Sequence, residues 1–150
     1  MKVVIQRVKQ SEVRIDGAIK AQIGQGLLVL VGIEEIDNQE DIEWLCRKII
    51  GLRIFEDQNQ VMNLSVQDID GDLIVVSQFT LQASTKKGNR PSYIKAAKPE
   101  IAIPLYESFV KCLEENMAKK VGTGTFGADM QVSLVNDGPV TILIDSQNRV

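Results

Sequence analysis

Histidine is missing from this chain of 150 residues. Catalysis in which a histidine activates a serine or a cysteine is therefore excluded, and so are metal sites built on histidine. Cysteine is scarce as well. Cys46 and Cys112 are the only two, and both stand beside apolar residues at helical spacing, which favours core packing over a zinc site or a disulfide framework. We therefore expect no metal and no cofactor.

Long apolar runs are also absent, since no stretch approaches the roughly 20 residues that cross a bilayer. The opening residues 1–5 turn polar too soon to form a secretory signal. We expect a cytoplasmic protein without membrane contacts. The chain length and an ordinary apolar content of 44% predict a single domain over residues 1–150.

Basic residues are fewer than acidic ones, which gives a net charge of −3 at pH 7. This argues weakly against a general nucleic-acid binder, and we expect no DNA partner. The charge is uneven, however, since acids gather in 34–43 while residues 86–98 contain only basic charges. The basic residues there are Lys86, Lys87, Arg90, Lys95 and Lys98. Such a loop can hold a phosphate chain or can simply be solvated, and charge alone favours neither.

Apolar patterning predicts many strands and two helices. Strands are expected over 2–8, 13–15, 18–23, 27–31, 52–55, 73–81, 130–135 and 140–144, with 61–70 left open. One helix is capped by Asp37 or Asn38 and ends at Gly51, and the other runs from Pro99 to Lys119. Their core-facing residues are Ile42, Leu45, Cys46, Ile49 and Ile50 in the first, and Ile101, Leu105, Phe109, Cys112 and Leu113 in the second. The order predicts an α/β fold with mixed, largely antiparallel sheets packed against two main helices.

The stretch 73–81 is the one around which the rest is organised. Residues 73–76 are leucine, isoleucine and two valines, an apolar run typical of a strand buried on both faces. The polar residues that follow are Ser77, Gln78 and Thr80, while Phe79 and Leu81 are expected to stay in the core. Buried polar groups need partners. Either these groups bond neighbouring backbone, or the strand end places hydroxyls and N–H groups at the rim of a pocket.

Two glycine motifs precede the end of the chain. Residues 122–127 match G-x-G-x-x-G, but a helix precedes them and a strand follows, so we reject a dinucleotide site. These glycines still permit close approach of a flat ring beside Phe126. Residues 136–139 read as a plain hairpin turn between the last two strands, although a Gly-Pro bond can also be cis.

Five segments together resemble the D-aminoacyl-tRNA deacylases, also called D-tyrosyl-tRNA deacylases. They are residues 4–8, 77–81 (Ser-Gln-Phe-Thr-Leu), 88–92, 124–130 and 136–141 (Asn-Asp-Gly-Pro-Val-Thr). They cover nearly the whole chain in the order of the family, with no departure at the two core motifs. The resemblance implies the fold of that family and a homodimer. It also implies hydrolysis of the ester between a D-amino acid and the 3′ end of tRNA, a proofreading step in translation.

The resemblance further implies roles for single residues. A cis Gly138-Pro139 dipeptide of one subunit would enter the active site of the other and reject L-amino acids, and Arg7 would hold it in place. Achiral glycine would pass this test. The terminal adenosine of tRNA would lie near Phe126, Gly127, Ala128 and Met130. With an RNA substrate implied, we expect Lys86, Lys87 and Arg90 to contact the tRNA backbone.

The mechanism has two candidates, both using the segment Ser77, Gln78, Phe79 and Thr80. In one, Thr80 is the nucleophile, but without histidine it lacks the usual base. In the other, backbone N–H groups around residues 78–80 form an oxyanion hole, and the 2′-hydroxyl of tRNA helps a water molecule. The missing histidine favours the second. The weak alternative to an enzyme is a nucleic-acid-binding module without turnover.

Overall fold

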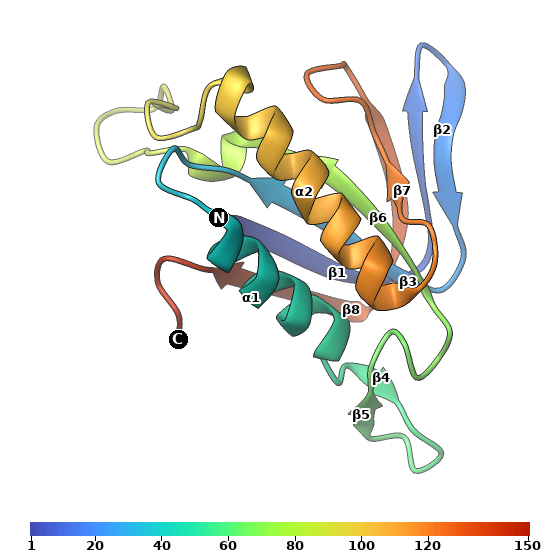
Figure 1. Ribbon diagram of the computed structural model, residues 1–150. Coiled ribbons are helices and arrows are strands. Elements are labelled where there is room, and N and C mark those ends of the chain that lie inside the picture. The colour runs from blue at the N-terminus through green and yellow to red at the C-terminus, as the bar shows by residue number, and fades with distance from the viewer.

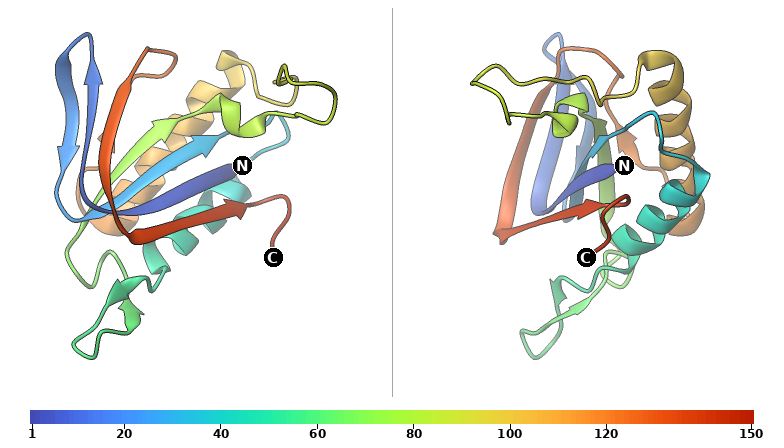
Figure 2. Two further views of the ribbon diagram at one scale, coloured as in Figure 1. Left: turned by 180° about the vertical axis from the view of Figure 1, so that it is seen from behind. Right: turned by 90° about the vertical axis from the view of Figure 1, so that its left-hand side faces the viewer.

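Six strands join in one curved sheet, and two helices cover one of its faces (Figures 1 and 2). The computed structural model describes every residue from 1 to 150. The strands of the sheet are β1 (Lys2–Ile15), β2 (Ala18–Ile23), β3 (Gly26–Gly32), β6 (Asp72–Ser77), β7 (Gly122–Thr123) and β8 (Gln131–Asp145). The helices are α1 (Gln39–Gly51), α2 (Pro99–Met117) and the short 3₁₀ helix η1 (Phe79–Gln82). A small hairpin pairs β4 (Phe55–Glu56) with β5 (Met62–Leu64).

The sheet is mixed and mostly antiparallel. Its strand order is β2-β1-β3-β6-β7, and β8 also pairs with β1. Strand β1 is antiparallel to β2, β3 and β8, whereas β6 is parallel to β3 and to β7. The turn between β1 and β2 has positive φ at Asp16 and Gly17, as a two-residue hairpin requires. The predicted α/β fold with largely antiparallel pairing and two main helices is confirmed.

The main core lies between the sheet and the two helices, which form a separate layer in the right-hand view of Figure 2. Helix α1 begins as predicted, because the side chain of Asn38 accepts from the Glu40 amide and the Asp41 carboxylate accepts from the Asn38 amide. Its predicted core face is fully buried. Neither helix combines the length and apolar character that crossing a bilayer requires.

The predicted core face of α2 is correct at Phe109 and Leu113 and wrong at Ile101. Ile101 is exposed, whereas its neighbour Ala102 is buried, and Tyr106 joins the core with Phe109 and Leu113. Tyr106 can be buried because its hydroxyl donates to the Val75 carbonyl oxygen at 2.7 Å, so the polar tip keeps a partner inside the core.

Several element boundaries also differ from the prediction. Helix α2 ends at Met117, two residues early, with Ala118 in the left-handed conformation (φ 54°). The short strand expected over 52–55 is β4, and the open region 61–70 contains β5. After β7 the chain enters a loop and then β8, with no helix, so rejection of the dinucleotide motif is confirmed.

The two predicted N-terminal strands are one strand, and so are the last two. Strand β1 pairs with β3 through residues 2–8 and with β2 through residues 11–15, so one long strand bridges both neighbours. Strand β8 continues through the predicted turn at 136–139, which is a correction. Its pairing with β1 passes from Val8↔Asn136 to Gln6↔Thr141, so the four residues 137–140 lie opposite Arg7 alone. The Asn136 side chain accepts from the Val140 amide at 2.9 Å and thereby closes a bulge where a hairpin was expected.

The predicted strand over 73–81 is wrong beyond Ser77. The Gln78 amide makes a last bond to the Val31 carbonyl oxygen (2.7 Å), and the chain then turns into η1. The side chain of Phe79, which we expected in the core, is 56% exposed. Gly32 makes this turn possible, because a Cβ there would lie 2.9 Å from Leu81 Cβ and 3.0 Å from the Gln78 oxygen.

We predict that Gly32→Ala displaces η1 and lowers the free energy of unfolding by about 2 kcal/mol, the usual cost of forcing extra atoms into a packed region. The measurement is urea denaturation, with hydrogen exchange at the amides of η1. Gly24→Ala is the matched control, since a Cβ there meets nothing within 4 Å, and it should stay within about 0.5 kcal/mol of wild type. Equal stability of the two variants would contradict this packing argument.

Candidate active site

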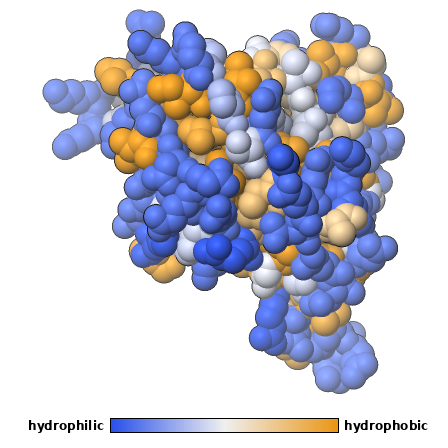
Figure 3. All heavy atoms as spheres, viewed as in Figure 1, coloured by the Kyte–Doolittle hydropathy of each residue, from blue (hydrophilic) through white to orange (hydrophobic).

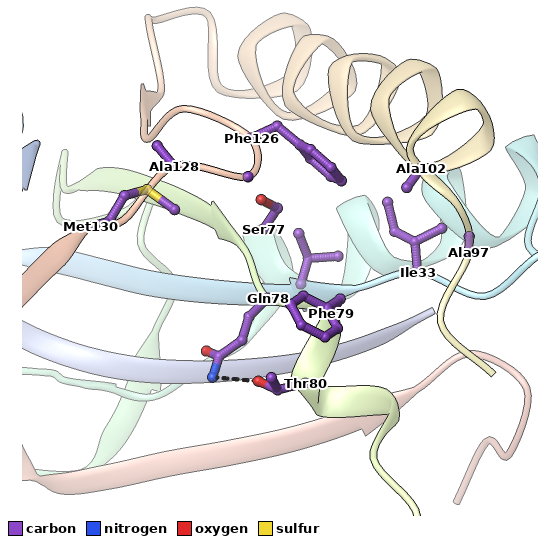
Figure 4. Close-up of a pocket in the computed structure, with 12 residues that line it drawn as sticks. Ile33, Ser77, Gln78, Phe79, Thr80, Ala97, Ala102, Phe126, Ala128 and Met130 are labelled. Carbon is purple, nitrogen blue, oxygen red and sulfur yellow. Dashed lines mark hydrogen bonds between the residues drawn. The ribbon is translucent and has the colours of Figure 1, made fainter. Parts of the chain in front are cut away.

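A cavity of about 200 Å³ opens where β6 ends, between η1, the start of α2 and the loop after β7 (Figure 4). The residues that line it are Val31, Ile33, Ser77, Gln78, Phe79, Thr80, Ala97, Ala102, Phe126, Gly127, Ala128 and Met130. None of the 12 has an ionisable side chain. The cavity therefore offers no general acid or base of its own, and its polar groups are hydroxyls, one amide side chain and backbone.

Two backbone amides at this cavity have no acceptor in the chain. They belong to Phe79 and Thr80 and open the first turn of η1, where a helix leaves its N–H groups unbonded. The Gln78 side chain does not cap them. The amide of Gln78 itself is occupied by Val31, which corrects our expectation that it is free. The available pair can stabilise an oxyanion that lies within hydrogen-bond reach of both amides.

The hydroxyl of Thr80 has no base beside it. Its Oγ1 accepts from Gln78 Nε2 at 3.0 Å, the bond dashed in Figure 4, and an amide N–H cannot take up a proton. Ser77 also faces the cavity, and its hydroxyl makes no bond within the chain. The geometry thus provides polar contacts for a ligand but no activated side-chain nucleophile.

One wall of the cavity comes from the loop after β7. Phe126, Gly127, Ala128 and Met130 are all brought there, so the structure gathers the four residues of this predicted group. Gly124, outside the cavity, leaves the space that the Met130 sulfur occupies.

Tyr106 supports this wall from behind. Its ring packs against that of Phe126 with centroids 6.2 Å apart, while its hydroxyl is bonded to β6. Burial raises the pKa of Tyr106 to about 12, so the hydroxyl remains a protonated donor at neutral pH. The aromatic wall is therefore tied to the same strand that ends at the cavity.

Arg7 is buried (5% exposed) under the bulge of β8. Its Nε donates to the Asp137 carbonyl oxygen at 3.0 Å and its Nη1 to the Ile54 carbonyl oxygen at 2.5 Å. The Asp137 carboxylate also lies 3.6 Å from Nε. The guanidinium thus fixes the backbone immediately before Gly138.

The Gly138-Pro139 peptide bond is cis. Gly138 has a φ of 131°, and a Cβ there would lie 3.0 Å from Arg7 Nη2, so glycine is required at this position. Both residues are exposed, and neither lines the cavity of its own chain.

The basic segment forms a projecting loop near the cavity. Ser84 and Ser92 exchange two backbone bonds of 2.8 and 2.9 Å that close its base. Lys86, Lys87 and Arg90 are exposed beyond that base and form no ion pair. Their side chains are free to meet anions.

Sequence reasoning missed the part of the cavity that comes from other elements. Val31 and Ile33 follow from the parallel pairing of β3 with β6, because the carboxyl ends of parallel neighbours meet at one edge. Ala97 lies just before α2 and Ala102 in its first turns, and these small residues leave the cavity open. The apolar runs in 27–31 and 73–76 could have indicated Val31 and Ile33 as neighbours of the site. No local pattern indicates Ala97 and Ala102.

The chain matches the family model described as D-Tyr-tRNA(Tyr) deacylase over residues 4–145. It is 74% identical over 149 residues to the D-aminoacyl-tRNA deacylase of Flavobacterium psychrophilum and 62% identical to that of Bacteroides thetaiotaomicron, with 99% of each chain covered.

Two solved structures share the fold. One is titled c-Myc DNA Unwinding Element Binding Protein, with a TM-score of 0.92, 41% identity and coverage of 97% of this chain and 98% of the other. The other, a probable eukaryotic D-amino acid tRNA deacylase, has a TM-score of 0.81 at 16% identity and covers 95% and 97%. The second likeness concerns the fold alone. With the family model and the closely similar sequences agreeing over almost its full length, the chain belongs to the D-aminoacyl-tRNA deacylase family, a family of ester hydrolases.

Proposed function

We propose that this protein hydrolyses the ester bond between a D-amino acid and the 3′ end of tRNA, as a proofreading step in translation. The observation that carries the proposal is a cavity without ionisable side chains that presents two unbonded amides, of Phe79 and Thr80. An aminoacyl ester is already reactive, so positioning and oxyanion stabilisation suffice for its hydrolysis. The names of the relatives agree with this substrate.

The proposed reaction is attack of water on the ester carbonyl carbon. The carbonyl oxygen becomes an oxyanion that accepts hydrogen bonds from the amides of Phe79 and Thr80. The neighbouring 2′-hydroxyl of the tRNA orients the water. The ester C–O bond then breaks, the 3′ oxygen takes the proton that the attacking water gives up, and the products are the free amino acid and tRNA with a 3′-hydroxyl. The Thr80 hydroxyl remains a polar contact, held by Gln78.

The aromatic wall suits the terminal adenosine. Phe126 offers a ring for stacking, Gly127 and Ala128 allow the base to approach the backbone, and Met130 adds an adaptable apolar surface. With the base against this wall and the ester near residues 79 and 80, the amino acid would extend toward the mouth of the cavity.

Rejection of L-amino acids is proposed to come from a partner subunit in a homodimer. Gly138 and Pro139 are exposed, and Arg7 is bonded to the Asp137 carbonyl oxygen just before them, yet they are absent from the cavity of their own chain. Val135 and Leu143, on the same strand, are exposed apolar residues suited to a subunit contact.

Backbone carbonyls of the dipeptide could accept from the α-amino group of a D-amino acid, while the side chain of an L-amino acid would collide with them. Glycine has no side chain and would be hydrolysed too. The first test is deacylation of D-Tyr-tRNA and L-Tyr-tRNA side by side. If the protein deacylates D-Tyr-tRNA no faster than buffer alone does, the proposed activity is refuted.

A nucleic-acid-binding module without turnover is the second candidate. The exposed basic loop favours it, and one structural relative is named for DNA binding. It requires salt-sensitive binding with no hydrolysis, so the same deacylation assay decides between the two candidates.

We predict that removing one oxyanion donor lowers kcat by about 10²–10³-fold. Phe79→Pro deletes the backbone N–H of residue 79. Proline fits there because residue 79 is the first of η1 and the preceding Gln78 is already extended. Phe79→Ala is the matched control, because it loses the same ring but keeps the donor. Thr80→Ala should retain kcat within about tenfold, since its amide remains. Abolished turnover in Thr80→Ala, with Phe79→Pro still active, would establish the nucleophile mechanism.

Arg7→Lys is expected to lower the ratio of D-ester to L-ester hydrolysis about tenfold, because a lost hydrogen bond from a charged donor is worth about 1.5–3 kcal/mol. A lysine cannot reach Asp137 and Ile54 together. The measurement is the initial rate on both esters, with thermal unfolding to confirm that the variant is folded. An unchanged ratio would show that Arg7 does not support chiral selection.

Mixing subunits tests whether the dipeptide acts across the interface. In a mixed dimer, the Phe79→Pro subunit has an intact dipeptide and a defective cavity, and the Arg7→Lys subunit has the reverse. The intact cavity meets the intact dipeptide only if the dipeptide acts in the partner subunit. Selectivity should therefore return in the mixed dimer. If the mixture stays as unselective as Arg7→Lys alone, the dipeptide acts within its own chain.

We also predict that replacing Lys86, Lys87 and Arg90 by Ala reduces the salt dependence of kcat/KM. Each contact to a single-stranded phosphate contributes about 0.7 to the slope of the logarithmic plot, so three contribute about 2. Replacing Lys111 and Lys120, exposed on and after α2, gives a control variant that loses two charges away from the loop. Equal slopes in both variants would indicate a general charge effect.

A further inference from the structure

Two aromatic side chains lie exposed at the mouth of the cavity. Phe79 is 56% exposed and Tyr93 38% exposed, and their rings meet edge to face with centroids 5.1 Å apart and an angle of 75°. Only 5% of the residues are aromatic, so an exposed pair is not a consequence of composition. Neither ring is needed for the core, and an exposed aromatic pair marks a contact surface.

The pair extends outward from the cavity. Phe79 lines the cavity itself, as Figure 4 shows, whereas Tyr93 lies one ring beyond it and does not line it. Tyr93 is also held in place. The Ser84–Ser92 bonds close the loop just before it, and its carbonyl oxygen accepts from the Ala96 amide at 3.0 Å. The surface is therefore ordered before a ligand arrives.

The surroundings of the pair are basic. Lys86, Lys87, Arg90 and Lys95 belong to the same loop, which contains no acidic residue from 86 to 98. Hydrophobic residues show on the surface around this loop and the start of α2 in Figure 3. Exposed rings beside unpaired cations are the combination that binds single-stranded nucleic acid, because bases stack on the rings and phosphates meet the cations.

We propose that Phe79 and Tyr93 form a stacking platform for the nucleotide that precedes the terminal adenosine of the tRNA. The proposal rests on the proposed function, in which the adenosine occupies the wall at Phe126. The base before it would leave the cavity past Phe79 and stack on the exposed pair, with its phosphate near the basic loop. Stacking does not depend on which base is present, so the platform would add affinity without restricting which tRNA is accepted.

The test compares D-Tyr-tRNA with the D-tyrosyl ester of adenosine, which lacks every nucleotide before the terminal adenosine. Tyr93→Ala should raise KM for D-Tyr-tRNA at least about fivefold with kcat retained, as expected for losing one stacked base. KM for the adenosine ester should change less than about twofold. Tyr93→Phe keeps the ring and should restore wild-type KM. Ile94→Ala, which removes the neighbouring exposed side chain, is the matched control and should leave KM unchanged for both substrates.

Several outcomes would overturn the platform. An equal KM increase for both substrates would place Tyr93 against the adenosine or the amino acid. An unchanged KM for D-Tyr-tRNA would show no contact. A Tyr93→Ala protein that loses its dimer in sedimentation would assign the pair to the subunit interface. Failure of wild-type protein to cleave D-Tyr-tRNA is a separate result and would refute the proposed function itself.

Discussion

The end of the pairing between β3 and β6 is the constraint on which the candidate site depends. The last bond runs from the Gln78 amide to the Val31 carbonyl oxygen, and beyond it the chain has no strand partner. Gly32 lets the next turn pack closely, and Gln82 secures that turn by donating to the Gly32 carbonyl oxygen at 2.9 Å. The result is a short helix whose first two amides are unbonded and belong to residues that line the cavity. A longer strand would have consumed those amides in the sheet.

Strand β1 connects this site to the second unusual feature of the fold. Its pairing with β8 is interrupted opposite Arg7, and the interruption holds residues 137–140 outside the ladder. A bulge of this kind would be loose without an anchor. Arg7 supplies it from within the sheet, with its charge bonded to two carbonyl oxygens and near one carboxylate. The two bonds of this buried guanidinium are costly to lose, so they define the position of the backbone before the dipeptide.

The absence of histidine has a structural counterpart in the cavity. Its lining contains no ionisable side chain at all, and Thr80 receives a hydrogen bond where a nucleophile would need a base. Backbone donors have one advantage over side chains, because their positions are set by the fold and need no reorganisation during the reaction.

Local pattern determined much of the fold. The apolar runs in 27–31 and 73–76, the Asp16-Gly17 turn and the capped helix α1 were all predictable, because periodicity, turn residues and caps act over a few residues. The family resemblance also pointed to residues 77–80, 126–128 and 130, and the structure brings them to one cavity.

Only the tertiary structure decided where those motifs depart from their local pattern. The strand after Ser77 is cut short by the packing of Gly32, which lies far away in sequence. The turn at 136–139 becomes a bulge because β1 pairs on both sides of it. Tyr106 joins the buried face of α2 because its hydroxyl finds an acceptor on Val75. Each of these depends on a contact between distant segments, and no local pattern contains that information.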